Sequence, residues 1–473
     1  MNILFASSEV YPLIKTGGLA DVSGALPKAL ADLGENPRIM LPAYPEVLAR
    51  SPKPRPVATT HHYGHEIHLL ESVLPDSNVP VYLVDCAAAF ARQGNPYVAD
   101  DGHDWPDNAW RFALFCQVVV DVALNRVGFD WPVDVVHCND WQSGLVPPLL
   151  SRFDVAPPSI FTIHNLAYRG LFPAQAFFDL GLPAALWSAD GLEFYDMLSF
   201  IKGGLAFAER VNTVSPTYAR EITTAEFGYG LEGLLQSRAD RLSGILNGID
   251  TAVWDPSSDT LIARNYDINS LDQRAFNKQA LQTRFGMPRE PRKLMLGLIS
   301  RLVNQKGLDL ILEAMPRLLE LPVQMVFLGS GEAWYEHALT DLARRFPGSV
   351  GVEIGYDEAL SHQIEAACDV YLMPSLFEPC GLNQLYSLRY GALPLVTAVG
   401  GLADSVVDAA QPQGNGFVMQ QPTVIDFIAC VERALDAWQD EHFWRGLQVN
   451  AMSADHSWHD RAVEYRELYR QVR

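Results

Sequence analysis

Short apolar runs alternate along the chain with longer segments in which apolar residues recur at helical spacing. This alternation is typical of parallel βα units, in which strands buried on both faces are apolar throughout and each covering helix buries one face. We predict strands at 3–6, 38–41, 81–84, 133–137, 160–163 and 211–214, and then at 244–246, 294–299, 323–328, 352–354, 370–373 and 395–397. Two sheets of about six strands are more plausible than one of a dozen, so the pattern predicts two α/β domains that meet near Ser243.

Length and charge narrow the functional classes. A chain of 473 residues is too long for one ordinary core, and its net charge of −21 disfavours a nucleic-acid partner. The six cysteines form no C-x-x-C pair, so we expect buried, reduced thiols rather than a zinc site. The first residues do not resemble a signal peptide, and no apolar stretch is long enough to span a bilayer, so a cytoplasmic protein is expected.

A five-residue sequence occurs once in each half of the chain. The run GGLAD begins at Gly17 and Gly18 and recurs at Gly400 and Gly401, each time before a helical pattern. A glycine pair at a helix start lets backbone N–H groups approach an anion, which the helix dipole also favours. Chance or a shared turn preference is the alternative, but the matched context favours two loops that bind a diphosphate.

Charged residues follow several predicted strands, where open α/β sheets bind ligands. Lys15 precedes the first glycine pair, and Arg301 and Lys306 follow the strand at 294–299. These cations could bind phosphate oxygens, although each could also be a solvated surface group. Glu378 follows the strand at 370–373 beside Pro, Cys and Gly, which favours a positioned carboxylate over a helix cap.

Two further candidates are less specific. His164 ends a predicted strand, where a structural histidine is a common alternative. Asp140 precedes Trp141, and an aspartate beside a tryptophan suits sugar binding. A helix-capping aspartate beside a core tryptophan is about as plausible. The acidic loop at 100–107 lacks the spacing of a calcium-binding EF-hand and is predicted to be an irregular surface or lid loop.

Taken in order, these motifs resemble those of bacterial glycogen synthases and starch synthases, which are retaining glycosyltransferases. The matching segments are 15–21, 139–141, 162–165, 247–250, 300–302, 305–307 and 378–382. The resemblance implies two Rossmann-like domains facing across a deep cleft, the GT-B type of fold. It implies an acceptor-side domain at 1–243, completed by a helix at 458–473, and a donor-side domain at 244–457.

The resemblance also implies roles for individual residues. Arg301 and Lys306 would neutralise the leaving diphosphate without a metal or another cofactor. Glu378 would hydrogen-bond the transferred glucose, and His164 would contact the same sugar in its oxocarbenium-like state. The remaining donor contacts would come from Lys15, Gly17, Gly18, Asp140, Asn247, Tyr356 (stacked on the base), Cys380, Gly381, Leu382, Gly401 and Leu402.

The implied reaction is transfer of glucose from ADP-glucose to the non-reducing end of an α-1,4-glucan such as glycogen, with release of ADP. No double-displacement nucleophile is evident, so front-face substitution assisted by the leaving phosphate is expected. Thr397-Ala398-Val399 stands where many relatives carry an Arg and a Thr, so a side-chain contact with the phosphate or the donor pocket is expected to be missing, which would alter nucleotide binding more than the reaction class. The alternatives are a related enzyme using UDP-glucose and a small acceptor, and a non-catalytic glucan-binding protein.

Overall fold

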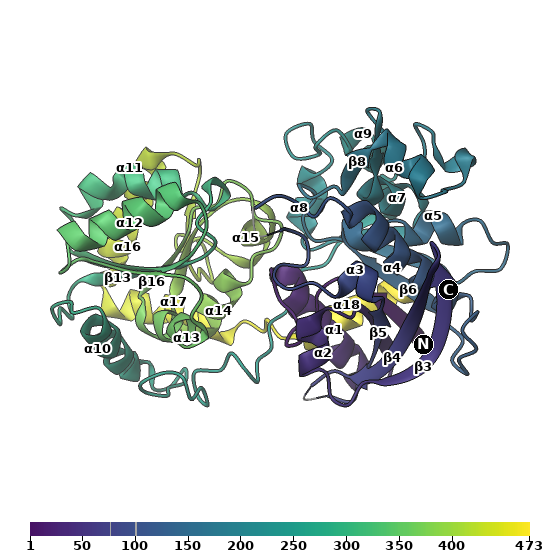
Figure 1. The fold of residues 1–473 in the computed structure, drawn as a ribbon. Helices are drawn as coiled ribbons and strands as arrows, with labels where there is room; N and C mark the ends of the chain where they lie inside the picture. The colour runs from purple at the N-terminus through teal and green to yellow at the C-terminus, as the bar shows by residue number, and fades with distance from the viewer. Residues whose placement is uncertain (76, 100–101) are drawn as a thin grey trace. The chain divides into compact units, whose positions relative to one another are not determined.

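The computed structural model describes residues 1–75, 77–99 and 102–473. It divides into two compact units (Figure 1): unit 1 comprises Met1–Asn247 and Trp458–Arg473, and unit 2 comprises Gly248–Ser457. Within the described ranges, no helix combines the length and hydropathy that a bilayer crossing requires.

Unit 1 is built on a nine-stranded sheet of described residues in the order β12-β11-β7-β6-β1-β2-β5-β4-β3. The strands from β12 to β5 run parallel, whereas β4 pairs antiparallel with both β5 and β3. Their bounds are β1 Asn2–Ala6, β2 Asn36–Pro42, β3 Arg55–His62, β4 His65–Val73, β5 Pro80–Asp85, β6 Val135–Asn139, β7 Ser159–Ile163, β11 Arg210–Thr213 and β12 Leu242–Gly244. A small antiparallel sheet contains β8 Leu171–Pro173, β9 Glu193–Phe194 and β10 Met197–Ser199.

Helices cover the sheet of unit 1, and their buried faces form its apolar cores. The α-helices are α1 Gly18–Asp32, α2 Pro45–Arg50, α3 Ala87–Phe90, α4 Asn108–Ala123, α5 Val146–Leu150, α6 Ala174–Asp179, α7 Phe200–Phe207, α8 Pro216–Glu221, α9 Glu232–Ser237 and α18 Trp458–Arg470. Short 3-10 turns are η1 Trp141–Ser143, η2 Ala184–Leu186 and η3 Ala239–Arg241.

The last helix, α18, is tied to the beginning of the chain. It lies beside α1, where the yellow and purple ribbons meet in Figure 1. Tyr465 and Tyr469 are completely buried between α18 and the sheet. The Tyr469 hydroxyl lies 2.8 Å from His137 Nδ1, and the Tyr465 hydroxyl accepts a hydrogen bond from Asn212 Nδ2 at 3.1 Å. These contacts place the C-terminal helix in unit 1.

Unit 2 has a parallel six-stranded sheet of described residues in the order β15-β14-β13-β16-β17-β18. Its strands are β13 Leu294–Ile299, β14 Val323–Gly329, β15 Val350–Ile354, β16 Val370–Met373, β17 Leu393–Thr397 and β18 Phe417–Met419. Its helices are α10 Arg274–Arg284, α11 Leu308–Leu318, α12 Ala333–Arg345, α13 Glu358–Ala367, α14 Asn383–Tyr390, α15 Gly400–Ser405, α16 Val424–Trp438 and α17 Glu441–Ser453, with 3-10 turns η4 Leu271–Gln273 and η5 Asn304–Lys306. Two apolar clusters fill the space between the sheet and its helices.

The predicted parallel sheets are confirmed, but one strand was assigned to the wrong half. The run at 244–246 does not begin the second sheet, because β12 pairs in parallel with β11 and forms the edge of the unit 1 sheet. A three-residue strand has too little pattern to show which sheet it joins.

The β3–β4 hairpin was also missed. Its strands carry many polar residues and are largely exposed or half-buried, unlike the continuous apolar runs used for prediction. Tyr63 and Gly64 join the strands with φ of 52° and 77°, the pair of positive values that a tight type I′ hairpin turn requires.

Candidate active site

Two loops that follow neighbouring strands of unit 2 are hydrogen-bonded together. Gln305, in the loop after β13, accepts from the Leu376 N–H at 2.9 Å and donates through its side chain to the Phe377 carbonyl at 3.0 Å. Gly307 ends η5 with φ of 74°, and an added Cβ there would lie 2.0 Å from the Pro374 carbonyl oxygen. Only glycine allows this left-handed, close approach, so the sequence Gln-Lys-Gly holds Lys306 against the second loop.

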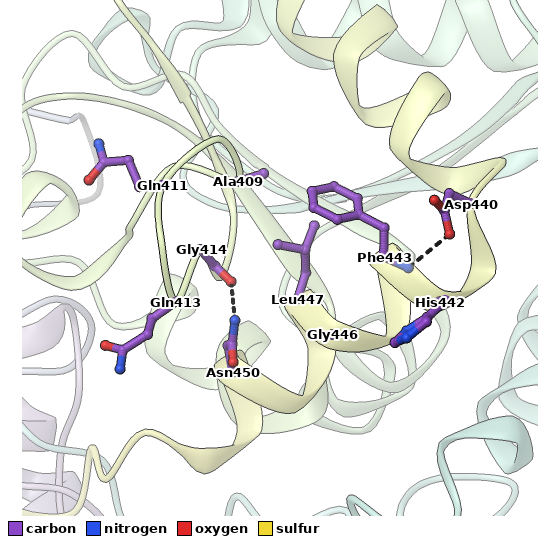
Figure 2. A pocket seen from close by; sticks show the side chains of 10 residues that line it. All are labelled: Ala409, Gln411, Gln413, Gly414, Asp440, His442, Phe443, Gly446, Leu447 and Asn450. Carbon is purple, nitrogen blue, oxygen red and sulfur yellow. Dashed lines mark hydrogen bonds between the residues drawn. The ribbon is translucent and has the colours of Figure 1, made fainter.

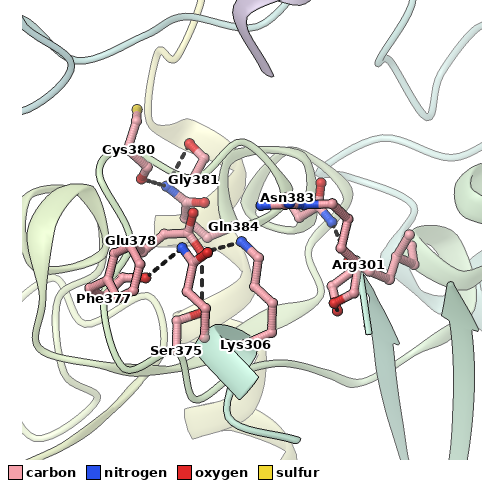
Figure 3. A network of polar contacts seen from close by, with 12 residues as sticks. Arg301, Lys306, Ser375, Phe377, Glu378, Cys380, Gly381, Asn383 and Gln384 are labelled. Carbon is pink, nitrogen blue, oxygen red and sulfur yellow. Dashed lines mark hydrogen bonds and ion pairs between the residues drawn. The ribbon is translucent and has the colours of Figure 1, made fainter. Parts of the chain in front are cut away.

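Lys306 and Glu378 meet as a consequence. Lys306 Nζ donates to Glu378 Oε2 at 2.5 Å, and the Ser375 hydroxyl donates to the same oxygen at 3.1 Å (Figure 3). The Glu378 side chain is 8% exposed and that of Lys306 is 17% exposed, so the pair is only weakly screened by water. The structure therefore brings two of the sequence-predicted catalytic residues into direct contact.

Arg301 stands at the end of β13, beside the same network (Figure 3). Asn383 donates to the Ile299 carbonyl at 2.6 Å and to the Tyr371 hydroxyl at 2.7 Å, which fixes the end of the strand. Arg301 itself is exposed. A rigid strand end thus presents an exposed guanidinium close to the Lys306–Glu378 pair.

The second glycine pair packs on the Glu378 loop. Gly401 N–H donates to the carbonyls of Glu378 and Pro379, both at 3.1 Å, and an added Cβ on Gly400 would lie 1.9 Å from the Glu378 carbonyl oxygen. The Gly401 amide is therefore engaged by two carbonyls within the protein. The close approach of the glycine pair fixes the backbone of Glu378.

The other donor-pocket candidates of unit 2 surround this loop. Gln384 donates to the carbonyls of Cys380 and Gly381, at 2.9 and 3.1 Å. Leu382 occupies the N-cap position of α14. The Leu402 side chain is completely buried in the core, so a donor contact by Leu402 would have to use its backbone.

Two more residues of unit 2 lie in segments that the sequence linked to nucleotide binding. Tyr356 is 74% exposed, as a residue meant to stack on a base would be, and its hydroxyl donates to Glu358. Thr397, in the segment that departs from the family pattern, has a buried hydroxyl with no hydrogen-bond partner in the described chain.

In unit 1 the first glycine pair folds around a carboxylate. Glu9, 3% exposed, accepts hydrogen bonds from the Thr16 N–H, the Thr16 hydroxyl at 2.6 Å and the Gly17 N–H at 3.2 Å. The Tyr97 hydroxyl donates at 2.7 Å to Glu9 Oε1, the oxygen that also accepts from the Thr16 hydroxyl. The Gly17 amide is engaged by Glu9, so anion binding by this pair would rest on Gly18, the first residue of α1. The Lys15 ammonium forms an ion pair with Asp21 Oδ1 at 2.8 Å.

Asp140 and His164 lie together at the ends of β6 and β7. The His164 N–H donates to Asp140 Oδ1 at 2.7 Å, and His164 Nε2 lies 2.9 Å from Asn139 Oδ1. Asn139 Nδ2 donates to the Ala6 carbonyl at 3.1 Å, which fixes the amide orientation and makes Nε2 the donating nitrogen of His164. Burial lowers the pKa of His164 to about 3, so its neutral ring keeps a lone pair on Nδ1.

Asp140 is held in an unusual state. Its φ of 55° and ψ of −178° lie in a region that residues other than glycine rarely occupy, at a cost of about 1–3 kcal/mol. Burial raises the pKa of its carboxyl to about 7, against the lowering effect of the backbone N–H groups of His164 and Asn165. Strain together with a pKa near neutrality marks Asp140 as a functional-site candidate.

Asn247 and Trp141 have contrasting environments. Asn247 is 6% exposed, and its Oδ1 has no hydrogen-bond partner among the described residues, as expected of an atom that awaits a ligand. Trp141 packs edge-on against Phe112 and Phe172 and is 9% exposed, so the core alternative for this residue is correct.

Sequence reasoning missed several supporting residues, notably Glu9, Tyr97, Ser375 and Asn383. Glu9 closely follows β1, and the rule that placed ligands at strand ends could have selected it. Tyr97 and Asn383 carry no comparable local signal, because tertiary contacts alone bring them to the site.

Metal binding has no counterpart in the described residues, where no group of three or more His, Cys, Asp or Glu could hold an ion. Asp100 and Asp101 of the acidic loop lie outside these residues. The six cysteines are all buried and free, as predicted.

Two family models together match most of the chain. Residues 2–237 match the starch synthase catalytic domain, and residues 282–445 match the glycosyl transferases group 1.

Curated relatives match over the full length. The chain is 50% identical to glycogen synthase 1 of Methylococcus capsulatus, covering 100% of this chain and 97% of that protein. It is 52% identical to a glycogen synthase of Cellvibrio japonicus, covering 99% and 98%.

Solved structures agree with the fold. The catalytic domain of starch synthase IV from Arabidopsis thaliana, bound to ADP and acarbose, matches with a TM-score of 0.89 and 34% identity over 100% of this chain and 99% of that one. Sucrose-phosphate synthase from Thermosynechococcus elongatus matches with a TM-score of 0.60 and 17% identity over 99% and 98%, which shows the fold alone. The expected fold of two Rossmann-like domains, of the GT-B type, is confirmed.

Proposed function

The chain belongs to the glycogen synthase and starch synthase family of retaining glycosyltransferases, and from this membership we propose its reaction in detail. It transfers glucose from ADP-glucose to the non-reducing end of an α-1,4-glucan and releases ADP. The observation that carries this proposal is the identity of about half of all residues to bacterial glycogen synthases over the full chain. The ADP bound by the related plant starch synthase supports the choice of nucleotide.

Unit 2 is assigned the binding of the nucleotide-sugar donor. Arg301 and Lys306 neutralise the leaving diphosphate, a role that suits two cations at one strand end. Glu378 binds a hydroxyl of the transferred glucose, while its contact with Lys306 couples the sugar site to the phosphate site. Tyr356, exposed on the same unit, stacks on the base.

Unit 1 is assigned the binding of the acceptor and the contacts with one side of the transferred glucose. The Nδ1 lone pair of neutral His164 accepts a hydrogen bond from a sugar hydroxyl. Asp140 and the unpartnered Asn247 side-chain oxygen line the same sugar site. Lys15 and Gly18 complete the donor contacts. Lys15 must leave its exposed ion pair with Asp21 to do so, which costs little at the surface.

Substitution occurs at the front face of the sugar. The departing phosphate oxygen takes the proton of the attacking acceptor hydroxyl, and the new bond forms on the side that the phosphate leaves, so the configuration is retained. The protein contributes chiefly by stabilising charge on the leaving group, and no metal is required. The buried, free thiols suit a reducing compartment, so the cytoplasm is the proposed location.

A donor panel tests the proposal. The protein is incubated with glycogen and ADP-glucose, UDP-glucose or GDP-glucose, and release of the nucleoside diphosphate is measured. ADP-glucose should give the highest kcat/KM. Turnover only of UDP-glucose with a small sugar acceptor would support the alternative transferase, and no turnover of any donor would support a glucan-binding protein.

A further inference from the structure

A hollow on unit 2 lies among residues to which the proposed reaction assigns no role. It is open to solvent and has a volume of about 430 Å³ between the turn at 409–414 and one face of α17. Phe443, Leu447 and Asn450 recur at the spacing of one helix face and form one wall, as Figure 2 shows. We propose that this hollow is a second binding site for an α-glucan chain, and the choice of polymer rests on the proposed function.

The walls of the hollow are already in place. Asn450 Nδ2 donates to the Gly414 carbonyl at 2.9 Å, which ties the helix to the turn. Asp440 accepts from the Phe443 N–H at 3.0 Å and so caps α17 at the rim. The turn is closed by a hydrogen bond from the Gln411 N–H to the Asp408 carbonyl at 2.8 Å. A site with rigid walls loses little conformational entropy when it binds a ligand.

The chemistry of the lining fits a neutral sugar. Its polar side chains include the amides of Gln411 and Gln413, the Asp440 carboxylate and the His442 imidazole, which can exchange hydrogen bonds with hydroxyl groups. The ten lining residues, all in the described chain, include no lysine or arginine, which disfavours phosphates and other anions. Phe443 is 44% exposed and offers a ring on which the C–H face of a glucose unit can stack.

Gly446 is a second, independent observation. It lies inside the 13-residue helix α17, where glycine is less stable than alanine by about 1 kcal/mol. A Cβ added to Gly446 would meet no atom within 4 Å, so packing within the protein does not require glycine here. Because Gly446 lines the hollow, the absence of a side chain keeps that space open for a ligand.

Gln413 supports the same conclusion. Its φ of 62° is unusual for a residue with a side chain, although it neighbours Gly414, and strain of this kind tends to persist at binding sites. A branched polymer held at this site stays near the enzyme while its chain ends are extended, which raises their effective concentration. The site should therefore affect long, branched acceptors and leave short ones unaffected.

Two variants and one matched control test the site. Phe443→Ala removes the ring, and Gly446→Leu fills the hollow with a better helix former, so the fold is retained. Phe276→Ala is the control, because Phe276 is also in unit 2 and is 48% exposed. Each variant is compared with the parent for KM and kcat with glycogen and with maltotetraose, and for retardation in native gels containing glycogen.

Both site variants should raise the KM for glycogen about tenfold, leave kcat and the maltotetraose constants unchanged, and lose most of the retardation. Phe276→Ala should behave like the parent. Unchanged retardation in both site variants, or equal losses with both acceptors, would overturn the inference. The gel needs no turnover, so failure of the proposed reaction would appear separately, as a parent protein that extends no glucan.

Discussion

Replacement of Glu378 by glutamine separates the two roles assigned to the Lys306–Glu378 pair. The change keeps the size of the side chain and removes its charge. In the structure Glu378 Oε2 accepts from Lys306 at 2.5 Å and from Ser375 at 3.1 Å, with the carboxylate 8% exposed. Glutamine can still accept both hydrogen bonds through its amide oxygen, so the variant should fold.

The magnitudes follow from the lost charge. Hydrogen bonds to charged groups contribute about 1.5–3 kcal/mol and neutral ones about 0.5–1.5 kcal/mol, so the free energy of unfolding should fall by about 1–2 kcal/mol. A similar or larger loss of transition-state stabilisation at the sugar predicts a kcat roughly 10- to 100-fold lower. Lys306, no longer neutralised by Glu378, should bind ADP at least as tightly as before.

The assay measures kcat with ADP-glucose and glycogen, and the Kd of ADP by calorimetry, for the parent and for Glu378→Gln. Ser375→Ala is the matched control, because it removes a neutral donor to the same carboxylate oxygen and should change kcat only a few-fold. A folded Glu378→Gln variant with normal kcat would reduce the carboxylate to a structural role. ADP affinity that falls in parallel with kcat would refute the assignment of Glu378 to the sugar.

Three other predictions follow from the structure. Activity should survive exhaustive treatment with EDTA, because Arg301 and Lys306 supply the charge that a metal would; full loss, restored only by magnesium or manganese, would contradict this. Burial alone would lower the pKa of His362, but the carboxylate of Asp259, hydrogen-bonded at 2.8 Å, and that of Glu358, 3.7 Å away, outweigh it and raise the pKa from 6.5 to about 9. The stabilisation, about 2 kcal/mol after allowance for solvent screening, is therefore complete below pH 6.5 and lost as the pH rises through 9; urea unfolding at pH 6 and 9.5 should show this difference in the parent and lose it in His362→Gln. The raised pKa of Asp140 destabilises the native state at neutral pH, because the native state holds a proton that the unfolded chain releases near pH 4, and stability therefore falls as the pH rises from 4 to 7. Asp140→Asn should therefore be more stable than the parent at pH 8, by about 4 kcal/mol, yet turn over more slowly; an equal stability difference at pH 5 and pH 8 would count against the raised pKa.

The buried strands were the most predictable part of the fold. Continuous apolar runs such as the one at 294–299 mark strands covered on both faces, and the structure has β13 at these residues. The β3–β4 hairpin and the three-residue β12 were misjudged because half-exposed or very short strands leave little hydrophobic signal. Sheet membership of such strands is decided by contacts with distant residues, which periodicity does not contain.

The candidate site was predictable where residues follow strands in sequence. That rule placed Lys306 and Glu378 at neighbouring strand ends, and the structure shows them in contact. It did not predict that Glu9 would occupy the Gly17 amide, or that Asp140 would adopt a positive φ. Both features depend on how loops from several strands pack, which local sequence does not determine.

The proposed reaction transfers glucose, with retention, to the non-reducing end of an α-1,4-glucan. The most direct measurement supplies ADP-glucose labelled in its sugar together with glycogen, and then digests the purified polymer with β-amylase, which releases maltose from non-reducing ends of α-1,4 chains. We expect nearly all the label to be released as maltose, in proportion to the ADP formed. Label that stays in a β-amylase-resistant polymer, or that appears as a soluble disaccharide before digestion, would contradict it.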